Sequence, residues 1–114
     1  MNAEEFLEYC SQKRGVEESF PFDNKTLVFK VGGKMFALSG IDDFVSINLK
    51  CDPERSIDLR ETYQGIKPGF HMNKKHWNTV SVESDVPNLL LKELIDHSYD
   101  LVYNSLPKHV KDGL

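Results

Sequence analysis

The side chains best able to do chemistry lie close together in the segment Lys67–Val80, KPGFHMNKKHWNTV. They include cations, hydrogen-bonding amides, imidazoles and the single tryptophan of the chain. A base or another planar ring could stack on the indole while lysines contact phosphate groups. The candidate binding residues are therefore Lys67, His71, Asn73, Lys74, Lys75, His76, Trp77 and Asn78.

The charge of this segment contrasts with that of the rest of the chain. Three lysines and no acidic residue give the segment +3, whereas the whole chain has a formal net charge of −4. The remainder therefore carries −7. Because an acidic protein repels phosphate backbones on average, contact with nucleic acid is expected to be local to this basic segment.

Each candidate residue also has a structural interpretation, and both interpretations stay open. Trp77 can anchor the segment against a sheet with its indole N–H bonded to a carbonyl. The lysines can belong to a solvated turn; if Asn73 caps one helical turn over Lys74–Trp77, free backbone N–H groups would favour an anion instead. Asn73, Asn78 and Thr79 can fasten the turn to neighbouring backbone or contact a ligand.

The sequence lacks the patterns of common catalytic and metal sites. His71 and His76 are five residues apart. At that spacing two metal ligands would not lie on the same face of a helix or of a strand. No GxSxG elbow, P-loop or GxGxxG motif is present. Cys10 and Cys51 form no CxxC pair. We therefore predict a protein that is not an enzyme and uses no cofactor or metal.

The elements that must position the segment form an α+β pattern. Alternating apolar residues predict an antiparallel β-meander over Thr26–Val31, Lys34–Leu38 and Val45–Leu49. Gly32-Gly33 is typical of a two-residue hairpin turn, and Ser39-Gly40 is a second expected turn. A later strand or hairpin is expected around 80–82, while the stretch 17–24 is predicted to be a loop.

Three helices are expected to flank this sheet. An N-terminal helix follows the capping residue Asn2, and a short middle helix follows Asp52-Pro53. A long C-terminal helix is predicted to start at a capping Asp85 and to stop at Pro107. The tail 108–114 is expected to fray.

Length and composition indicate one soluble domain over residues 1–114. Hydrophobic residues make up 39% of the chain and charged residues 28%, as in globular proteins. No apolar run approaches the roughly 18 residues of a membrane span. The acidic, amphipathic N-terminus is unlike a secretory signal, so a cytoplasmic location without membrane contact is expected.

The segment Pro68–Val80 closely resembles the signature of the MmcQ/YjbR family of small bacterial proteins. Segments around Phe6–Val16, Ser46–Glu54 and Ser98–Pro107 agree with other parts of that family. The resemblance implies an antiparallel sheet flanked by helices, a fold likened to frataxin-type domains and described as a double-wing arrangement compatible with DNA binding. It implies no reaction and no ligand, because a fold alone does not define a function.

The frataxin likeness raises one further alternative. An acidic metal-binding ridge could be formed by Glu4, Glu5, Glu8, Glu17 and Glu18, although carboxylates on a first helix more often cap it and keep it solvated.

Two hypotheses about function follow. The first is a non-enzymatic protein that binds nucleic acid, such as DNA, through Lys67–Val80. The alternative is a small-ligand or protein-binding domain with a pocket between the sheet and His71–Trp77. Both lose their anchor if Trp77 is buried and the lysines diverge.

Overall fold

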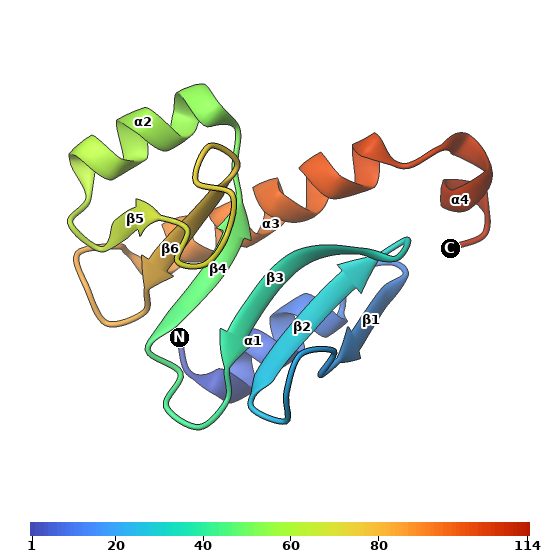
Figure 1. Cartoon of the computed structure of the whole chain (residues 1–114), viewed down its shortest axis with the longest axis horizontal. Helices are drawn as coiled ribbons and strands as arrows, with labels where there is room; N and C mark the ends of the chain where they lie inside the picture. Colours follow the sequence, from blue (N-terminus) through green and yellow to red (C-terminus); the bar gives the residue numbers. More distant parts are fainter.

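The computed structural model describes all 114 residues and contains one six-stranded antiparallel sheet and four helices (Figure 1). The strand order is β1-β2-β3-β4-β6-β5. The strands are β1 (Val16–Ser19), β2 (Thr26–Val31), β3 (Lys34–Gly40), β4 (Ser46–Lys50), β5 (Ile66–Pro68) and β6 (Trp77–Ser81). The helices are α1 (Ala3–Ser11), α2 (Pro53–Thr62), α3 (Asn88–Ser105) and α4 (Lys108–Asp112). The predicted α+β class, an antiparallel sheet flanked by helices, is confirmed.

One face of the sheet carries the main hydrophobic core. Side chains alternate along a strand, so Leu27, Phe29 and Val31 of β2 all point to this face and are buried. α1 and α3 pack there and pass behind the sheet in Figure 1. The main apolar positions of α3 in this core are Leu91, Leu94, Ile95 and Val102. None of the four helices combines the length and apolar character needed to cross a membrane.

The opposite face of the sheet, which we call the open face, has a much smaller apolar cluster with no helical residue. Its buried members are Val28, Leu38 and Trp77, and the partly buried Met35 and Met72 pack against them. The loop between β5 and β6 lies over part of this face, and its Met72 packs against the apolar cluster (Figure 1). The open face is therefore only partly covered.

The stretch over which β3 and β4 pair, which we call the seam, is short. These strands pair only through Ala37–Leu49 and Leu38–Asn48. The β2–β3 register shifts so that Phe36 has no partner on β2, which is a β-bulge. Beyond the bulge β4 turns away from β3 (Figure 1).

A serine from α3 fills the gap where the seam ends. The Ser98 hydroxyl accepts the Lys50 N–H at 2.9 Å and donates to the Phe36 carbonyl at 2.5 Å. It thus satisfies one backbone group on each strand at the point where the two strands separate. Ser98 is fully buried, so water cannot substitute for it.

The predicted starts of the first two helices are confirmed, whereas that of the third is wrong. Asn2 and Asp52 accept the N–H groups of Glu5 and Arg55. Asp85 caps no helix: its carboxylate accepts the N–H groups of residues 64 and 65, at 2.8 and 2.9 Å. α3 begins after Pro87 without a side-chain cap.

Three other predictions about local structure are wrong. The stretch 17–24 is not all loop, because Val16–Ser19 pairs with β2 as an edge strand. β3 continues through Ser39-Gly40 instead of turning there. The tail forms α4, because Leu106 and Val110 pack closely over Gly32. The hairpin turn itself is confirmed, with positive φ angles at Gly32 and Gly33.

A histidine joins α3 to the start of α2. The Nε2 atom of His97 accepts the Asp52 N–H at 3.2 Å, so the ring must be neutral on that nitrogen. Burial, followed by the nearby Arg55 guanidinium, lowers the pKa of His97 below its ordinary value of 6.5. The unfolded chain therefore binds a proton at a higher pH than the folded chain does.

This difference makes stability depend on pH. The contribution of His97 is fully present above about pH 6.5 and is lost as the pH falls below that value. We expect the free energy of unfolding, measured by urea denaturation, to decrease between about pH 7.5 and about pH 5. His97→Gln, which keeps an acceptor without titrating, should flatten this dependence. His109→Gln on the exposed α4 should not; an equal effect of both changes would contradict the assignment.

Candidate functional site

Trp77 is a structural anchor of the candidate segment. Its side chain is 9% exposed and packs against Val28 and Leu38 on the open face. An indole covered in this way is not a free platform for a stacked base. The packing role of Trp77 is therefore the one the structure shows, although no carbonyl accepts from its indole N–H, and both hypotheses lose the anchor that this ring was expected to provide.

Asn78 is also held inside the protein. It is 2% exposed, its Oδ1 accepts from Arg60 Nε at 2.7 Å and its Nδ2 donates to Ser56 Oγ at 3.3 Å. The Nη2 atom of Arg60 also donates to the carbonyls of Lys74 and Trp77, at 2.5 and 3.2 Å. One guanidinium thus fastens both ends of the Lys74–Asn78 turn to α2. No motif in the sequence had singled out Arg60.

The turn itself uses two more of the candidate residues for its own structure. Asn73 Oδ1 accepts the Lys75 N–H at 3.0 Å, and the Asn73 carbonyl accepts from the N–H groups of His76 and Trp77. Lys74 Nζ donates to the Gly69 carbonyl at 3.0 Å. Asn73 therefore caps a turn that never becomes a helix. Lys74 is directed back to the backbone instead of standing beside Lys75 in an open cluster.

The remaining candidates lie at different places. His76 is half-buried and its carbonyl accepts the Cys51 N–H at 2.8 Å. Lys67 is exposed on β5, and Lys75 is exposed in the turn. Only His71, with a positive φ of 59°, lines a cavity. The eight candidates therefore do not form one site.

A pocket of about 390 Å³ lies on the open face, between the sheet and the loop that starts at Phe70. We call it the open-face pocket. Phe22 and Phe70 are 65% and 68% exposed, although both are large and apolar. The pocket lies between the sheet and the candidate segment, as the second hypothesis expected. Its lining residues are Phe22, Thr26, Leu38, Asn48, Phe70, His71 and Met72.

A chain of hydrogen bonds orients the polar floor of this pocket. Thr79 Oγ1 accepts the Phe70 N–H at 2.9 Å and donates to Asn48 Oδ1 at 2.5 Å. Since its carbonyl oxygen is occupied, Asn48 has its Nδ2 donors left, and no group of the chain accepts from them. Neighbouring Thr26 already donates its hydroxyl hydrogen to Asp23 at 3.3 Å.

The open face is locally basic. Lys30, Lys50 and Lys67 pair across the sheet with Met35, Trp77 and Thr79, and none of the three forms an ion pair. Among the outward positions of β2 to β6 there is no carboxylate, but Glu17 of the edge strand β1 lies directly across from Lys30 on this face. A chain with a net charge of −4 thus presents two cations, Lys50 and Lys67, that have no carboxylate across from them on this face.

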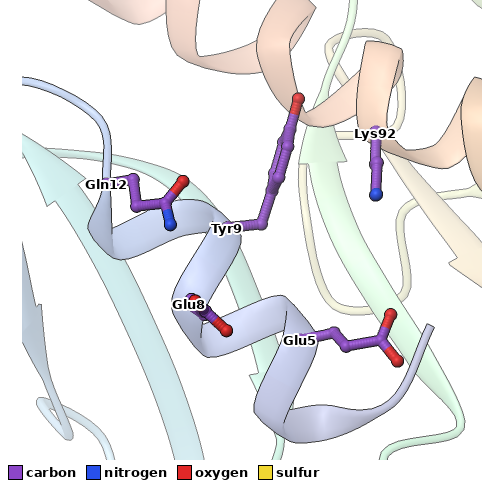
Figure 2. A pocket seen from close by; sticks show the side chains of 5 residues that line it. All are labelled: Glu5, Glu8, Tyr9, Gln12 and Lys92. Atoms are coloured by element: carbon purple, nitrogen blue, oxygen red, sulfur yellow. The ribbon is translucent and has the colours of Figure 1, made fainter.

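A second, shallower depression lies between α1 and α3 (Figure 2). Its volume is about 170 Å³, and it is lined by Glu5, Glu8, Tyr9, Gln12 and Lys92. Burial, followed by the hydrogen bond to Asp96, raises the pKa of Tyr9 to about 12, so the phenol stays protonated. No three His, Cys, Asp or Glu side chains of the molecule converge as a metal site would require.

Comparison with known proteins identifies the family. The YjbR family model matches residues 11–101. The chain belongs to the YjbR family. It is 45% identical over 94 residues to the uncharacterized protein YbdF of Escherichia coli O157:H7, covering 82% of this chain and 77% of YbdF. It is 34% identical over 109 residues to the uncharacterized protein YjbR of Escherichia coli K12, covering 95% and 92% of the two chains.

Solved structures of YjbR-like domains have the same fold. The Deinococcus radiodurans protein DR2400, described as a DUF419 domain, superposes with a TM-score of 0.91 at 41% identity, over 98% of this chain and 86% of that one. A Pseudomonas syringae protein superposes with a TM-score of 0.75 at 31% identity, over 90% of this chain and 99% of that one.

The open-face pocket of this YjbR-family chain includes residues that sequence reasoning missed. Thr26, Leu38 and Asn48 come from three different strands. Their positions on the non-core alternation of each strand were a usable signal, because the same pattern that identifies the core also identifies the other face. Phe22 lies in a loop, and nothing in the local sequence relates it to Phe70.

Proposed function

We propose that this YjbR-family chain is a non-catalytic binding protein whose ligand is a small molecule held in the open-face pocket. The observation that carries the proposal is a pocket lined by Phe22 and Phe70, two aromatic side chains that are left largely exposed. A concave, mainly apolar site with a few oriented polar groups is the usual form of a small-molecule site. Asn48 supplies the oriented polar group here.

The chemistry of the thiols supports a role without covalent catalysis. Burial raises the pKa of the Cys10 thiol to about 12 and also raises the pKa of Cys51. A nucleophilic cysteine needs a lowered pKa and access to substrate. Both thiols are free and buried, as is ordinary in the cytoplasm, which is the location we propose.

The pocket proposal is tested by a fragment screen followed by one substitution. We expect at least one aromatic fragment to raise the melting temperature and to shift the NMR signals of Thr26, Asn48 and Met72, because a ligand that binds the native state stabilises it. Phe70→Ala should weaken binding of that fragment by about tenfold, through loss of contact area on one wall.

The control for this substitution is Leu89→Ala. Leu89 is 82% exposed at the start of α3 and lies outside the pocket, so its loss should leave binding unchanged. A broad screen in which no fragment shifts the pocket signals would defeat the small-molecule proposal.

A second candidate function is binding of nucleic acid, in its single-stranded form; the double-wing arrangement that the family resemblance implies is compatible with DNA binding in general. It is favoured by Lys30, Lys50 and Lys67 on the face that carries the exposed ring of Phe70. Aromatic and basic side chains on an exposed sheet suit unpaired bases and phosphates. Affinity for a short oligonucleotide should then fall by about tenfold or more between 50 and 200 mM salt, roughly as three phosphate contacts require. No binding at low salt would end this candidate.

A further inference from the structure

We infer that the open-face pocket takes an aromatic acid: a flat ring between Phe22 and Phe70, with a carboxylate or similar anionic group bound by the Asn48 amide. This inference rests on the proposed small-molecule function and adds the chemical class of the ligand. It follows from the apolar walls, the free donors at the floor and the charge of the surrounding face.

The walls of the pocket favour a flat ring. Phe22 and Phe70 supply two aromatic side chains, while Leu38 and Met72 supply aliphatic and thioether surface. Aromatic rings prefer offset or edge contacts with one another, and methionine sulfur also packs well against rings. The two phenyl groups are largely exposed in the free protein, so a ring that enters between them removes their apolar surface from water.

The floor of the pocket favours an acceptor on that ring. Asn48 Oδ1 already accepts from Thr79, whereas both N–H bonds of Asn48 Nδ2 are left for a ligand. Asp23, whose carboxylate is hydrogen-bonded to the lining residue Thr26, already accepts from two backbone N–H groups and the Thr26 hydroxyl. A ligand acceptor at Asn48 would therefore use the free donors of the one amide that lines this pocket.

The electrostatics favour an acceptor that is negatively charged. Lys50 lies two residues from Asn48 on the same face of β4, and Lys67 lies directly across from Thr79. Neither lysine has a carboxylate partner. Hydrogen bonds to a charged acceptor are roughly twice as strong as neutral ones, and these unpaired cations add a favourable potential.

Three probes with one ring system test this selectivity. 2-Naphthoate, 2-naphthalenemethanol and protonated 2-naphthalenemethanamine differ in the charge of a single substituent. Each is titrated into the full ¹⁵N-labelled chain while the Asn48 side-chain amide signals are followed. We expect naphthoate to bind at least about fivefold more tightly than the alcohol, and the ammonium compound to bind most weakly.

Asn48→Asp is the decisive variant. It keeps an oxygen for the Thr79 hydroxyl, removes the amide donors and adds a negative charge. The order of the three probes should therefore invert, with the ammonium compound tightest. Asn104→Asp makes the same change at an exposed position of α3 and should leave the order unchanged.

The double change Lys50→Gln with Lys67→Gln gives a second measure that leaves Asn48 intact. It should weaken naphthoate about threefold or more and leave the alcohol unaffected. If the alcohol binds as tightly as naphthoate and neither variant changes the ratio, the aromatic-acid inference is overturned while pocket binding stands. If no probe and no screened fragment shifts the pocket signals, the small-molecule function fails with it.

Discussion

Replacing Arg60 with alanine is expected to lower the free energy of unfolding by about 3 kcal/mol. The guanidinium is the partner of Asn78 Oδ1 and of the carbonyls of Lys74 and Trp77. Asn78 is buried, so its oxygen would be left without a hydrogen bond and without ready access to water. Leaving a buried acceptor unsatisfied costs about 1–3 kcal/mol, and the turn would also lose its fastening to α2.

Chemical denaturation and thermal melting measure this effect, and a substitution on the same helix controls for it. Arg55→Ala removes a pair with Glu93 whose side chains are 32% and 52% exposed. Exposed pairs contribute about 0.2–1 kcal/mol, so the melting temperature should change little. Arg60→Lys should not restore stability, because an ammonium group cannot reproduce the planar fork. Similar losses for the two alanine variants would refute the clamping role of Arg60.

Ser98→Ala is expected to cost a similar amount, about 3 kcal/mol, although it deletes a single oxygen. That oxygen serves the Lys50 N–H and the Phe36 carbonyl where β3 and β4 separate. Both backbone groups would be left unpaired beside a fully buried site. Each such loss costs about 1–3 kcal/mol, and neither Phe36 nor Lys50 belongs to the two residue pairs that join β3 to β4.

The matched control is Ser105→Ala in the same helix. Ser105 Oγ donates only to the Val102 carbonyl of its own helix, at 2.6 Å, and Ser105 is exposed. Alanine also has a higher helix propensity, so this change should lie within about 0.5 kcal/mol of no effect. If urea denaturation gives equal midpoints for the two variants, the bridging role of Ser98 is wrong.

Local rules predicted the elements whose determinants lie close together in sequence. The hairpin at Gly32-Gly33 needs positive φ at neighbouring residues, and the caps at Asn2 and Asp52 act within one turn. Asp85 satisfied the same local rule for a cap and was assigned wrongly. Its partners are 20 and 21 residues away, where two backbone N–H groups compete for its carboxylate.

The site was predicted less well than the fold, and the reason is long-range pairing. Segment Lys67–Val80 concentrates polar and aromatic types, but much of that chemistry holds the segment to α2 and to the open face. The importance of Arg60 depends on where α2 lies relative to the turn, which no local pattern encodes. The pocket likewise depends on three strands whose register brings Leu38 opposite Asn48. His71 alone among the eight candidates lines it.

The seam has a consequence for how a ligand would act on this protein. Phe22, Thr26 and Leu38 belong to the β1–β3 half of the sheet, whereas Asn48 and the Phe70–Met72 stretch belong to the β4–β6 half. Two residue pairs, the Ser98 bridge and a hydrogen bond from the Ser39 hydroxyl to the Ser46 carbonyl at 2.6 Å hold these halves edge to edge. A bound molecule that contacts both halves would hold them together. It would slow amide hydrogen exchange along β3 and β4 far more than at the outer strands.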